Sequence, residues 1–152
     1  MNIRPASSAD RDAILALVRR LAERGTPPGR DERQIAAVDM QTMTTALGDA
    51  SPQSVVLVAE ESNAIIGFVH VRTVTDYYTQ ASIGHVSDIV VQQEAEGKGV
   101  GHALIEAAQA WARSQGYVMM QLYVLPENTA ARKLYERMGY RAEWLKYVKP
   151  LS

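Results

Sequence analysis

Three glycines stand within five residues, at positions 97, 99 and 101, where a strand-like segment gives way to a helix-like one. Helix propensity does not explain them, because each glycine costs up to about 1 kcal/mol relative to alanine inside a helix. A glycine-rich loop that opens a helix presents unpaired N–H groups and the positive end of the helix dipole, which together bind phosphate oxygens. The stretch from Val91 to His102 therefore indicates a site for a phosphate-bearing ligand; a tight turn without a ligand is the alternative.

Two familiar phosphate-binding motifs are excluded. A dinucleotide-binding G-x-G-x-x-G pattern needs a glycine at position 102 or 104, where the sequence has His102 and Leu104. The phosphate loop G-x-x-x-x-G-K does not occur either. The ligand is therefore expected in another kind of loop.

A second segment whose residues can take part in a reaction lies near the C-terminus. Ala131, Leu134 and Met138 form the apolar stripe of a short predicted helix. Tyr135 lies beside this stripe, where its phenol can turn toward a cleft and donate a proton, or can serve as a packing residue. Asn128 is predicted to cap the helix, with a ligand contact as the alternative.

The hydrophobic pattern predicts the elements that position these segments. Val55 to Ala59 is an unbroken apolar run, which is typical of a strand covered on both faces, so helices are expected on both sides of the sheet. Strands are expected at residues 2–5, 54–60, 64–74, 81–91, 118–125 and 140–149, and helices at about 7–24, 31–47, 100–115 and 128–138. The order β-α-α-β-β-β-α-β-α-β predicts an α+β domain with a mixed sheet.

Composition excludes several classes of protein. The 152 residues suffice for one domain and are too few for two. Cysteine is absent and the three histidines lack a helical metal-binding spacing, so neither a thiolate nucleophile nor a metal is expected. The 16 basic and 17 acidic residues nearly cancel, which argues against nucleic acid as a partner. No apolar leader or membrane-length apolar run occurs, so we expect a cytoplasmic protein without a membrane partner.

Charge is unevenly distributed along the chain. From Gln34 to Gly97 there are eight acidic residues and a single basic one, Arg72. An acidic middle favours a cationic ligand, with a solvated acidic surface as the alternative.

The two segments together resemble the GNAT superfamily of acetyl-CoA-dependent N-acetyltransferases. The superfamily's Q/R-x-x-G-x-G/A signature aligns with residues 96–101, Glu-Gly-Lys-Gly-Val-Gly, at the usual distance after the strand valine, Val91. Its N-x-x-A-x-x-L-Y-x-x-x-G-F/Y pattern is matched without a gap by Asn128, Ala131, Leu134, Tyr135, Gly139 and Tyr140. Because the predicted element order also matches, the resemblance covers almost the whole chain.

The resemblance implies one GNAT-like domain over residues 1–152, with a central, mostly antiparallel twisted sheet and helices on both faces. It implies acetyl-CoA as co-substrate and direct transfer of its acetyl group to a primary amine in a ternary complex. The absence of cysteine and of a G-x-S-x-G motif agrees with transfer that involves no covalent enzyme intermediate. The cofactor-binding residues implied are Ile89, Val90, Val91, Glu96, Gly97, Lys98, Gly99, Val100, Gly101, His102, Asn128 and Tyr135.

The resemblance also suggests catalytic roles. Tyr135 corresponds to the tyrosine that protonates the departing thiolate. An alkylammonium must lose a proton before it attacks, so a base is needed near the third long strand. Asp88 is the first candidate, because family members often have a carboxylate here. His85 is the second candidate, and a water that leads to a more distant carboxylate is the third.

Glu96 departs from the family signature, which has glutamine or arginine there. Its carboxylate would face a diphosphate across a short distance unless the side chain turns to solvent or pairs with Lys98. On this electrostatic reasoning Glu96→Arg is expected to lower the Michaelis constant for acetyl-CoA, and an unchanged or higher value would contradict it.

The acceptor is an amine on a small molecule, peptide or protein, and the acidic middle favours a cationic one. Asp76, Tyr77 and Tyr78 form a polar aromatic loop that can recognise such an acceptor or be an ordinary exposed loop. A homodimer through the last strand is compatible with the resemblance. The alternatives to an enzyme are a non-catalytic acyl-CoA-binding regulatory domain and an interaction domain without a cofactor.

Overall fold

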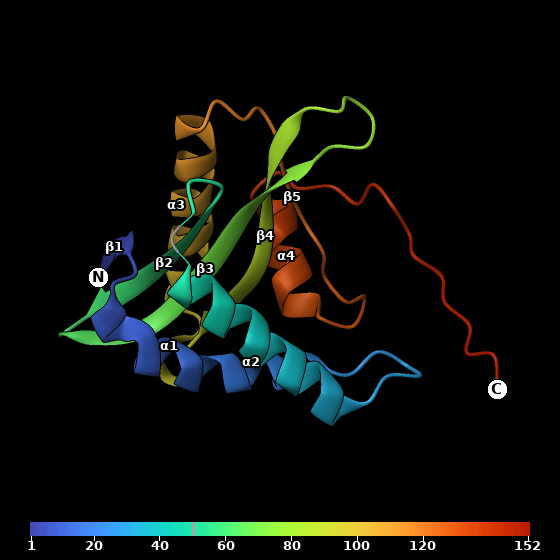
Figure 1. Ribbon diagram of the computed structural model, residues 1–152, viewed down its shortest axis with the longest axis horizontal. Helices are drawn as coiled ribbons and strands as arrows, with labels where there is room; N and C mark the ends of the chain where they lie inside the picture. Colours follow the sequence, from blue (N-terminus) through green and yellow to red (C-terminus); the bar gives the residue numbers. More distant parts are fainter. Residues whose placement is uncertain (50) are drawn as a thin grey trace.

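The helices and strands of the chain follow the predicted order as far as the fourth helix (Figure 1). The structure is a computed structural model that describes residues 1–49 and 51–152. The strands are β1 (Asn2–Pro5), β2 (Ser54–Glu61), β3 (Ala64–Thr75), β4 (Ser82–Val91) and β5 (Met120–Leu122). The α-helices are α1 (Arg11–Val18), α2 (Glu32–Gly48), α3 (Val100–Ser114) and α4 (Thr129–Arg137). Short 3-10 helices are η1 (Ser8–Asp10), η2 (Arg19–Arg24) and η3 (Gln93–Ala95).

The five strands form one sheet in the order β1-β2-β3-β4-β5. Neighbouring strands from β1 to β4 pair antiparallel, and β4 pairs with β5 in parallel. The predicted α+β class, with a mostly antiparallel sheet, is therefore confirmed. The parallel pair requires a crossover, which α3 provides between β4 and β5.

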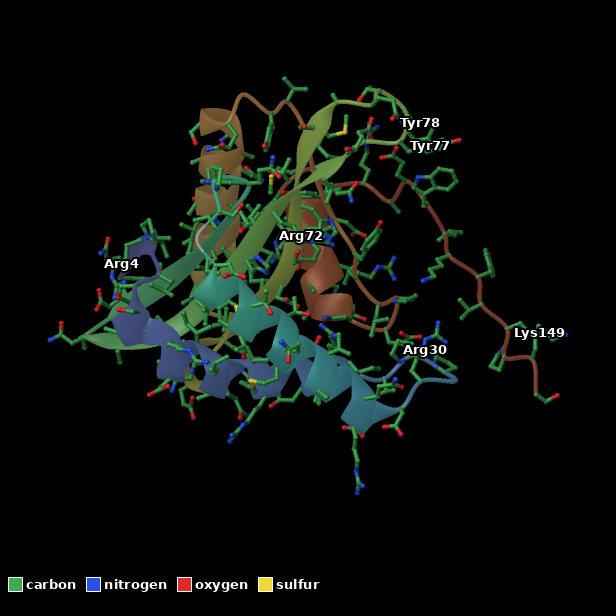
Figure 2. The ribbon with its side chains drawn as sticks, in the orientation of Figure 1. Arg4, Arg30, Arg72, Tyr77, Tyr78 and Lys149 are labelled. Carbon is green, nitrogen blue, oxygen red and sulfur yellow. The ribbon has the colours of Figure 1, made fainter. Side chains whose placement is uncertain are left out.

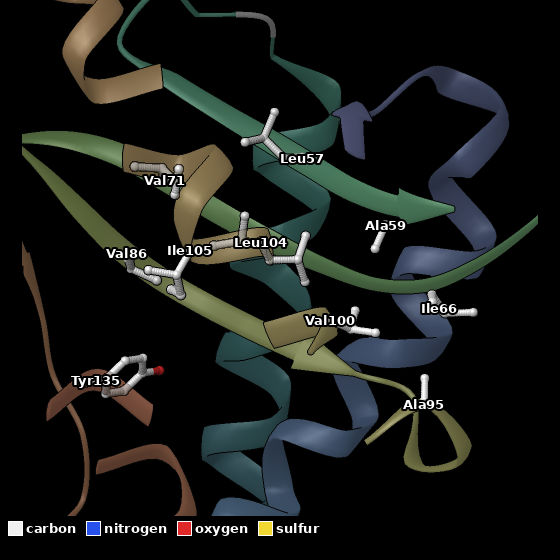
Figure 3. Close-up of a cluster of buried hydrophobic side chains, with 12 residues drawn as sticks. Leu57, Ala59, Ile66, Val71, Val86, Ala95, Val100, Leu104, Ile105 and Tyr135 are labelled. Atoms are coloured by element: carbon white, nitrogen blue, oxygen red, sulfur yellow. The ribbon is translucent and has the colours of Figure 1, made fainter. Parts of the chain in front are cut away.

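Helices cover both faces of the sheet, as the apolar run in β2 predicts. Val56 and Val58 pack with residues of α1 and α2 on one face, and Leu57 and Ala59 pack with residues of α3 on the other. Tyr135 of α4 joins the α3-side cluster (Figure 3). Because side chains alternate along a strand, both faces of β2 must be apolar.

The predicted last strand, residues 140–149, is absent, and this part of the sequence-based prediction was wrong. The chain after α4 is irregular to its end at Ser152 and runs away from the sheet (Figure 1). β5 is also shorter than the predicted 118–125, and no strand pairs with its outer edge among the described residues. Trp144, Leu145 and Tyr147 are exposed, so alternating apolar residues alone did not bring this segment to the short free edge of β5.

Among residues 1–49 and 51–152, no helix combines the length and the apolar character that crossing a bilayer requires.

Candidate active site

β4 and β5 pair over only three residues and then separate. Gly84, His85 and Val86 of β4 lie opposite residues 120–122 of β5, whereas β4 continues to Val91. β4 still pairs with β3 on its other side as far as Val91. The second half of β4 therefore has one paired edge and one free edge, which faces the gap left by β5.

The free edge of β4 belongs to Ile89 and Val91. The Gln92 amide donates to the Ile66 carbonyl of β3 at 2.7 Å. Successive residues of a strand direct their N–H and C=O groups to opposite sides, so those of Ile89 and Val91 are directed away from β3. The Val91 carbonyl already accepts from Arg20, which leaves the Ile89 groups and the Val91 N–H for a ligand. An extended ligand can thus add alongside β4 as a further strand.

The glycine loop at the end of β4 has the backbone that only glycine adopts easily. Gly97 and Gly99 have φ angles of +73° and +82°. No described atom lies within 4 Å of the position that a Cβ would take at either residue. The loop is thus open, and its conformation does not arise from tight packing.

Six consecutive main-chain N–H groups, those of residues 97–102, have no acceptor in the hydrogen bonds recorded for the described chain. Ala103 is the first residue beyond them to donate, to the Gly99 carbonyl at 3.0 Å. Residues 100–102 are the first turn of α3, where the positive end of the helix dipole adds to the unpaired donors. The arrangement suits an anion with several acceptor oxygens, as predicted from the glycines.

Glu96 is paired with Arg20, and the expected partner Lys98 is not recorded in any ion pair of the described chain. Arg20 Nη2 lies 2.8 Å from Glu96 Oε1, and the same guanidinium bonds Glu23 and donates to the Val91 carbonyl. The Glu96 amide donates to the Gln93 carbonyl at 3.2 Å, so the free donors begin at Gly97. Arg20 thus supplies the counter-charge that the glycine loop was predicted to lack.

Replacing Arg20 tests this compensation more directly than Glu96→Arg. Arg20→Met leaves the Glu96 carboxylate uncompensated, so we expect the Michaelis constant for acetyl-CoA to rise about two- to fivefold. The double variant Arg20→Met/Glu96→Gln removes both charges and should recover most of that loss in steady-state kinetics. Glu23→Gln is the matched control, with an unchanged value expected. Equal Michaelis constants for Arg20→Met and wild type would contradict the electrostatic account.

Asp88 lies just where β4 and β5 part. His70 and Val71 of β3 pair with Asp88 and Val86, so Ser87 is an extra residue that forms a β-bulge. Asp88 faces η2 and α2: its Oδ1 lies 3.8 Å from Arg24 Nη1, and Arg24 Nη2 lies 3.2 Å from Asp39 Oδ2. Burial, and then the nearby Asp39 carboxylate, raise the pKa of Asp88 to about 6, against the opposing effects of Arg24 and Arg72.

His85 is less suited to act as the base. Its Nδ1 lies 3.1 Å from the Gln121 amide nitrogen, which can only donate, so Nδ1 is the acceptor and is already occupied. Burial, followed by the charges of Arg72 and His70, lowers the pKa of His85 to about 4. A group with so low a pKa holds a proton from an ammonium weakly. The geometry thus favours Asp88.

Tyr135 lies on the other face of the sheet. Its side chain is buried in the cluster beside α3, and its ring makes an edge contact with Tyr140 at a centroid distance of 5.9 Å. Burial, and then Tyr140, raise the pKa of Tyr135 to about 12, so the phenol keeps its proton at neutral pH. In Figure 3 the hydroxyl is directed away from α4. Tyr135, the candidate acid, and Asp88, the candidate base, therefore lie on opposite faces of the sheet.

The remaining predicted cofactor residues lie in the first turn of α3 and at the start of α4. Asn128 caps α4, accepting from the Ala131 amide at 3.3 Å, as predicted. His102 is half exposed at the start of α3, with Nδ1 3.6 Å from a Glu106 carboxylate oxygen. Val100 is buried, and Gly101 would bring a Cβ within 3.4 Å of Leu134. Only the main-chain groups of these last two residues can meet a ligand.

The aromatic loop before β4 is arranged differently from the expectation. The buried Asp76 carboxylate accepts from the Thr79 amide and hydroxyl, at 2.9 and 2.7 Å, so it closes the turn instead of facing an acceptor. Tyr77 and Tyr78 are exposed at the far tip of the loop (Figure 2). Tyr78 stacks on Trp144 at a centroid distance of 5.8 Å.

Sequence reasoning missed three residues of the site: Arg20, Arg24 and Asp39. All three lie on predicted amphipathic helices, where charged residues normally face solvent. Their partners Glu96 and Asp88 are 49 or more positions away along the chain. The only available signal was that Arg20 and Arg24 are four residues apart and so share one side of a helix.

A sheet split beside a strand with a free edge, followed by a helix-opening loop of unpaired amides, suits an extended ligand that carries a phosphate group, such as an acyl-CoA. The model of the Acetyltransferase (GNAT) family matches residues 16–140. The chain therefore belongs to the GNAT family of acetyltransferases.

Similarities to individual proteins agree with this membership. The chain is 32% identical over 145 residues to the uncharacterized N-acetyltransferase YhfO of Bacillus subtilis (strain 168), covering 94% of this chain and 91% of that protein. It is 38% identical over 93 residues to a mycothiol acetyltransferase of Salinispora tropica, covering 60% of this chain but only 30% of that longer protein.

Solved structures share the fold at low sequence identity. The ribosomal-protein-alanine N-acetyltransferase of Brucella melitensis biovar Abortus 2308 has a TM-score of 0.74 at 23% identity, covering 99% of this chain and all of that one. AAC(6')-Iy in complex with the bisubstrate analogue CoA-S-monomethyl-acetylneamine has a TM-score of 0.75 at 20% identity, covering 99% and 98%. These identities establish the fold and do not identify the acceptor.

Proposed function

We propose that this acetyltransferase moves the acetyl group of acetyl-CoA directly to a primary amine while both substrates are bound. The observation that carries the proposal is the row of unpaired amides at residues 97–102, placed where the free edge of β4 ends. The coenzyme's diphosphate would accept hydrogen bonds from this row. Its pantetheine arm would lie along Ile89 to Val91 and reach the gap beside β5.

The two proton transfers take place on opposite faces of the sheet. Asp88, on the α2 side, accepts a proton from the acceptor ammonium, so that the neutral nitrogen can form the C–N bond with the acetyl carbon. As the C–S bond breaks, Tyr135, on the α4 side, donates its proton to the departing thiolate. The bonded nitrogen releases its second proton to water, and Tyr135 regains a proton from water. The free N–H groups of β4 are placed to stabilise the oxyanion that develops between these two events.

The charges around the acceptor side favour a protonated amine. Asp88 and Asp39 share Arg24, so two carboxylates face one guanidinium in a largely buried setting. An incoming ammonium would offset the remaining negative charge. AAC(6')-Iy, which shares the fold, was solved in complex with the bisubstrate analogue CoA-S-monomethyl-acetylneamine, so amines of this kind belong in the set of acceptors to test.

The direct test is a screen of primary amines with acetyl-CoA, in which thiol release and acetylated product are both measured. We expect turnover with at least one class of amine. In parallel, CoA at 100 times its dissociation constant should raise the unfolding free energy by about 2.7 kcal/mol. Stabilisation by CoA without turnover of any amine would indicate the non-catalytic acyl-CoA-binding domain. Absence of stabilisation would indicate an interaction domain.

The proposal includes a homodimer formed through the C-terminal segment. Trp144, Leu145 and Tyr147 are exposed, and the outer edge of β5 has no partner strand among the described residues. Residues 140–149 of one copy would pair with that edge in a second copy. Light scattering should give twice the monomer mass for the wild type and the monomer mass for Leu145→Asp/Tyr147→Asp. A wild-type monomer at every concentration would contradict the dimer.

A further inference from the structure

A shallow cavity of about 460 Å³, largely open to solvent, lies between α2 and strands β2 and β3, on the same sheet face as Asp88. Its volume is within the range of small-molecule binding sites. Thr42 and Thr45 of α2 and Ser54 of β2 contribute hydroxyl groups to its lining, and His70 and Arg72 of β3 close it from the sheet. The proton transfers proposed above use none of these five residues.

His70 has an unsatisfied polar atom at this cavity. Its side chain is 4% exposed, and Nδ1 is buried without a hydrogen-bond partner in the described chain. Burial, and then the charge of Arg72, lower the pKa of His70, so the ring is neutral at pH 7 and carries one donor and one acceptor nitrogen. A buried polar atom without a partner is costly, so a rotation of the ring that brings Nδ1 to a ligand in the cavity would be favoured.

Arg72 brings a positive charge to an otherwise acidic part of the chain. Its Nε donates to the Ser87 hydroxyl at 2.8 Å, whereas its two Nη groups have no recorded acceptor in the described chain. Figure 2 shows Arg72 over the middle of the sheet, far from the loop tip with Tyr77 and Tyr78. A guanidinium with both Nη groups free matches the paired oxygens of a carboxylate.

Strand register connects this cavity to the candidate base. His70 lies opposite Asp88, and Arg72 lies opposite His85, so these four side chains share one face of the sheet. Residues two apart on a strand are separated by roughly 7 Å, so a ligand only a few bonds long spans from Asp88 to Arg72. Such a ligand would meet a carboxylate at one end and a guanidinium at the other.

We propose that the acceptor is a primary amine that also carries a carboxylate, with its nitrogen at Asp88 and its carboxylate held by the Nη groups of Arg72. The proposal rests on the proposed acetyltransferase function and specifies its substrate class. Asp49, which caps the C-terminal end of α2, adds a negative charge to the cavity lining. It repels any carboxylate in the cavity, so the attraction of Arg72 must exceed this repulsion.

The test compares acceptors that differ only in the carboxylate: lysine with cadaverine, tyrosine with tyramine, and 4-aminobutyrate with propylamine. The wild type should favour the carboxylated member of the pairs it acetylates by tenfold or more in kcat/KM. Arg72→Gln should reduce that ratio at least tenfold, and Arg72→Lys should restore part of it. Arg113→Gln, an exposed charge change on α3 at the other face, should keep the wild-type ratio.

Arg72 also contacts the bulge at Ser87, so replacing it affects the neighbouring Asp88 as well as the proposed carboxylate site. The ratio of kcat/KM values distinguishes these two effects, because a change at Asp88 lowers kcat/KM for both members of a pair. A wild-type ratio near one, or equal losses on both members of each pair in Arg72→Gln, would overturn the carboxylate site while leaving the acetyltransferase function in place. If no amine is acetylated, the proposed function fails. Calorimetry with 4-aminobutyrate in the presence of CoA then tests the carboxylate site by itself. Binding to wild type that Arg72→Gln abolishes supports it; no binding to wild type overturns it.

Discussion

Tyr135→Phe is expected to lower kcat about tenfold or more while the protein folds normally. The substitution removes only the hydroxyl, which is the group proposed to protonate the departing thiolate. The ring stays in place to pack in the α3-side cluster and against Tyr140. Because burial raises the pKa of Tyr135 to about 12, the wild-type phenol is protonated throughout the neutral range and can always act as the donor.

Tyr140→Phe is the matched control for this result. Tyr140 is the ring partner of Tyr135, and its hydroxyl accepts from Gln109 at 3.1 Å, outside the proposed chemistry. Steady-state kinetics and thermal unfolding of both variants should show a loss of turnover for Tyr135→Phe alone. Wild-type turnover in Tyr135→Phe, or equal losses in the two variants, would rule out the acid role.

Asp88→Asn is expected to lower kcat by about a hundredfold at neutral pH, in the range typical of a lost general base. In the wild type, kcat/KM should rise as the pH increases through about 6, because the Asp88 carboxylate must be ionised to accept a proton. In the variant that lower limb of the pH profile should disappear. If kcat/KM of Asp88→Asn still rose fully near pH 6, that rise would belong to another group.

Two further variants identify the group that titrates. Asp39→Asn removes a negative charge that raises the pKa of Asp88, so the limb should move to lower pH. His85→Gln should retain the limb, because the pKa of His85 is already lowered to about 4. A limb that stays in place in Asp39→Asn and vanishes in His85→Gln would make His85 the base.

The same carboxylate should make the wild type less stable than Asp88→Asn above about pH 6. The pKa of Asp88 is raised from 3.8 to about 6, so the folded state holds the proton more tightly than the unfolded state. Below about pH 3.8 both states are protonated and there is no penalty; the penalty develops as pH rises toward 6 and is complete above it. We expect the variant to gain about 1–3 kcal/mol in unfolding free energy at pH 7 and little at pH 3.

Local sequence patterns predict most of the fold because most of its elements are strongly amphipathic or continuously apolar. The apolar run in β2 and the stripe of α3 each specify their own burial, and both are confirmed. The predicted last strand fails for a different reason: a strand needs an edge to pair with, and β5 ends after three residues. Pairing depends on distant residues, so alternation within residues 140–149 cannot determine it.

The candidate site likewise has some features that local sequence determines and others that depend on distant residues. The glycine loop was predictable, because positive φ angles at Gly97 and Gly99 favour a residue type that is visible in the sequence. The bulge at Ser87, which interrupts the alternation of β4, is not visible, because it arises from register with β3. The pairing of Arg20 with Glu96 and the grouping of Asp39 with Asp88 likewise require the folded chain.

The central claim is that the main-chain N–H groups of residues 97–102 bind the diphosphate of coenzyme A. A crystal structure of the protein grown with CoA tests it most directly. We predict diphosphate oxygens within about 3 Å of several of these nitrogens, with the pantetheine arm along β4 toward the gap beside β5. A diphosphate bound elsewhere on the protein, with the amides of this loop left to water, would contradict the account.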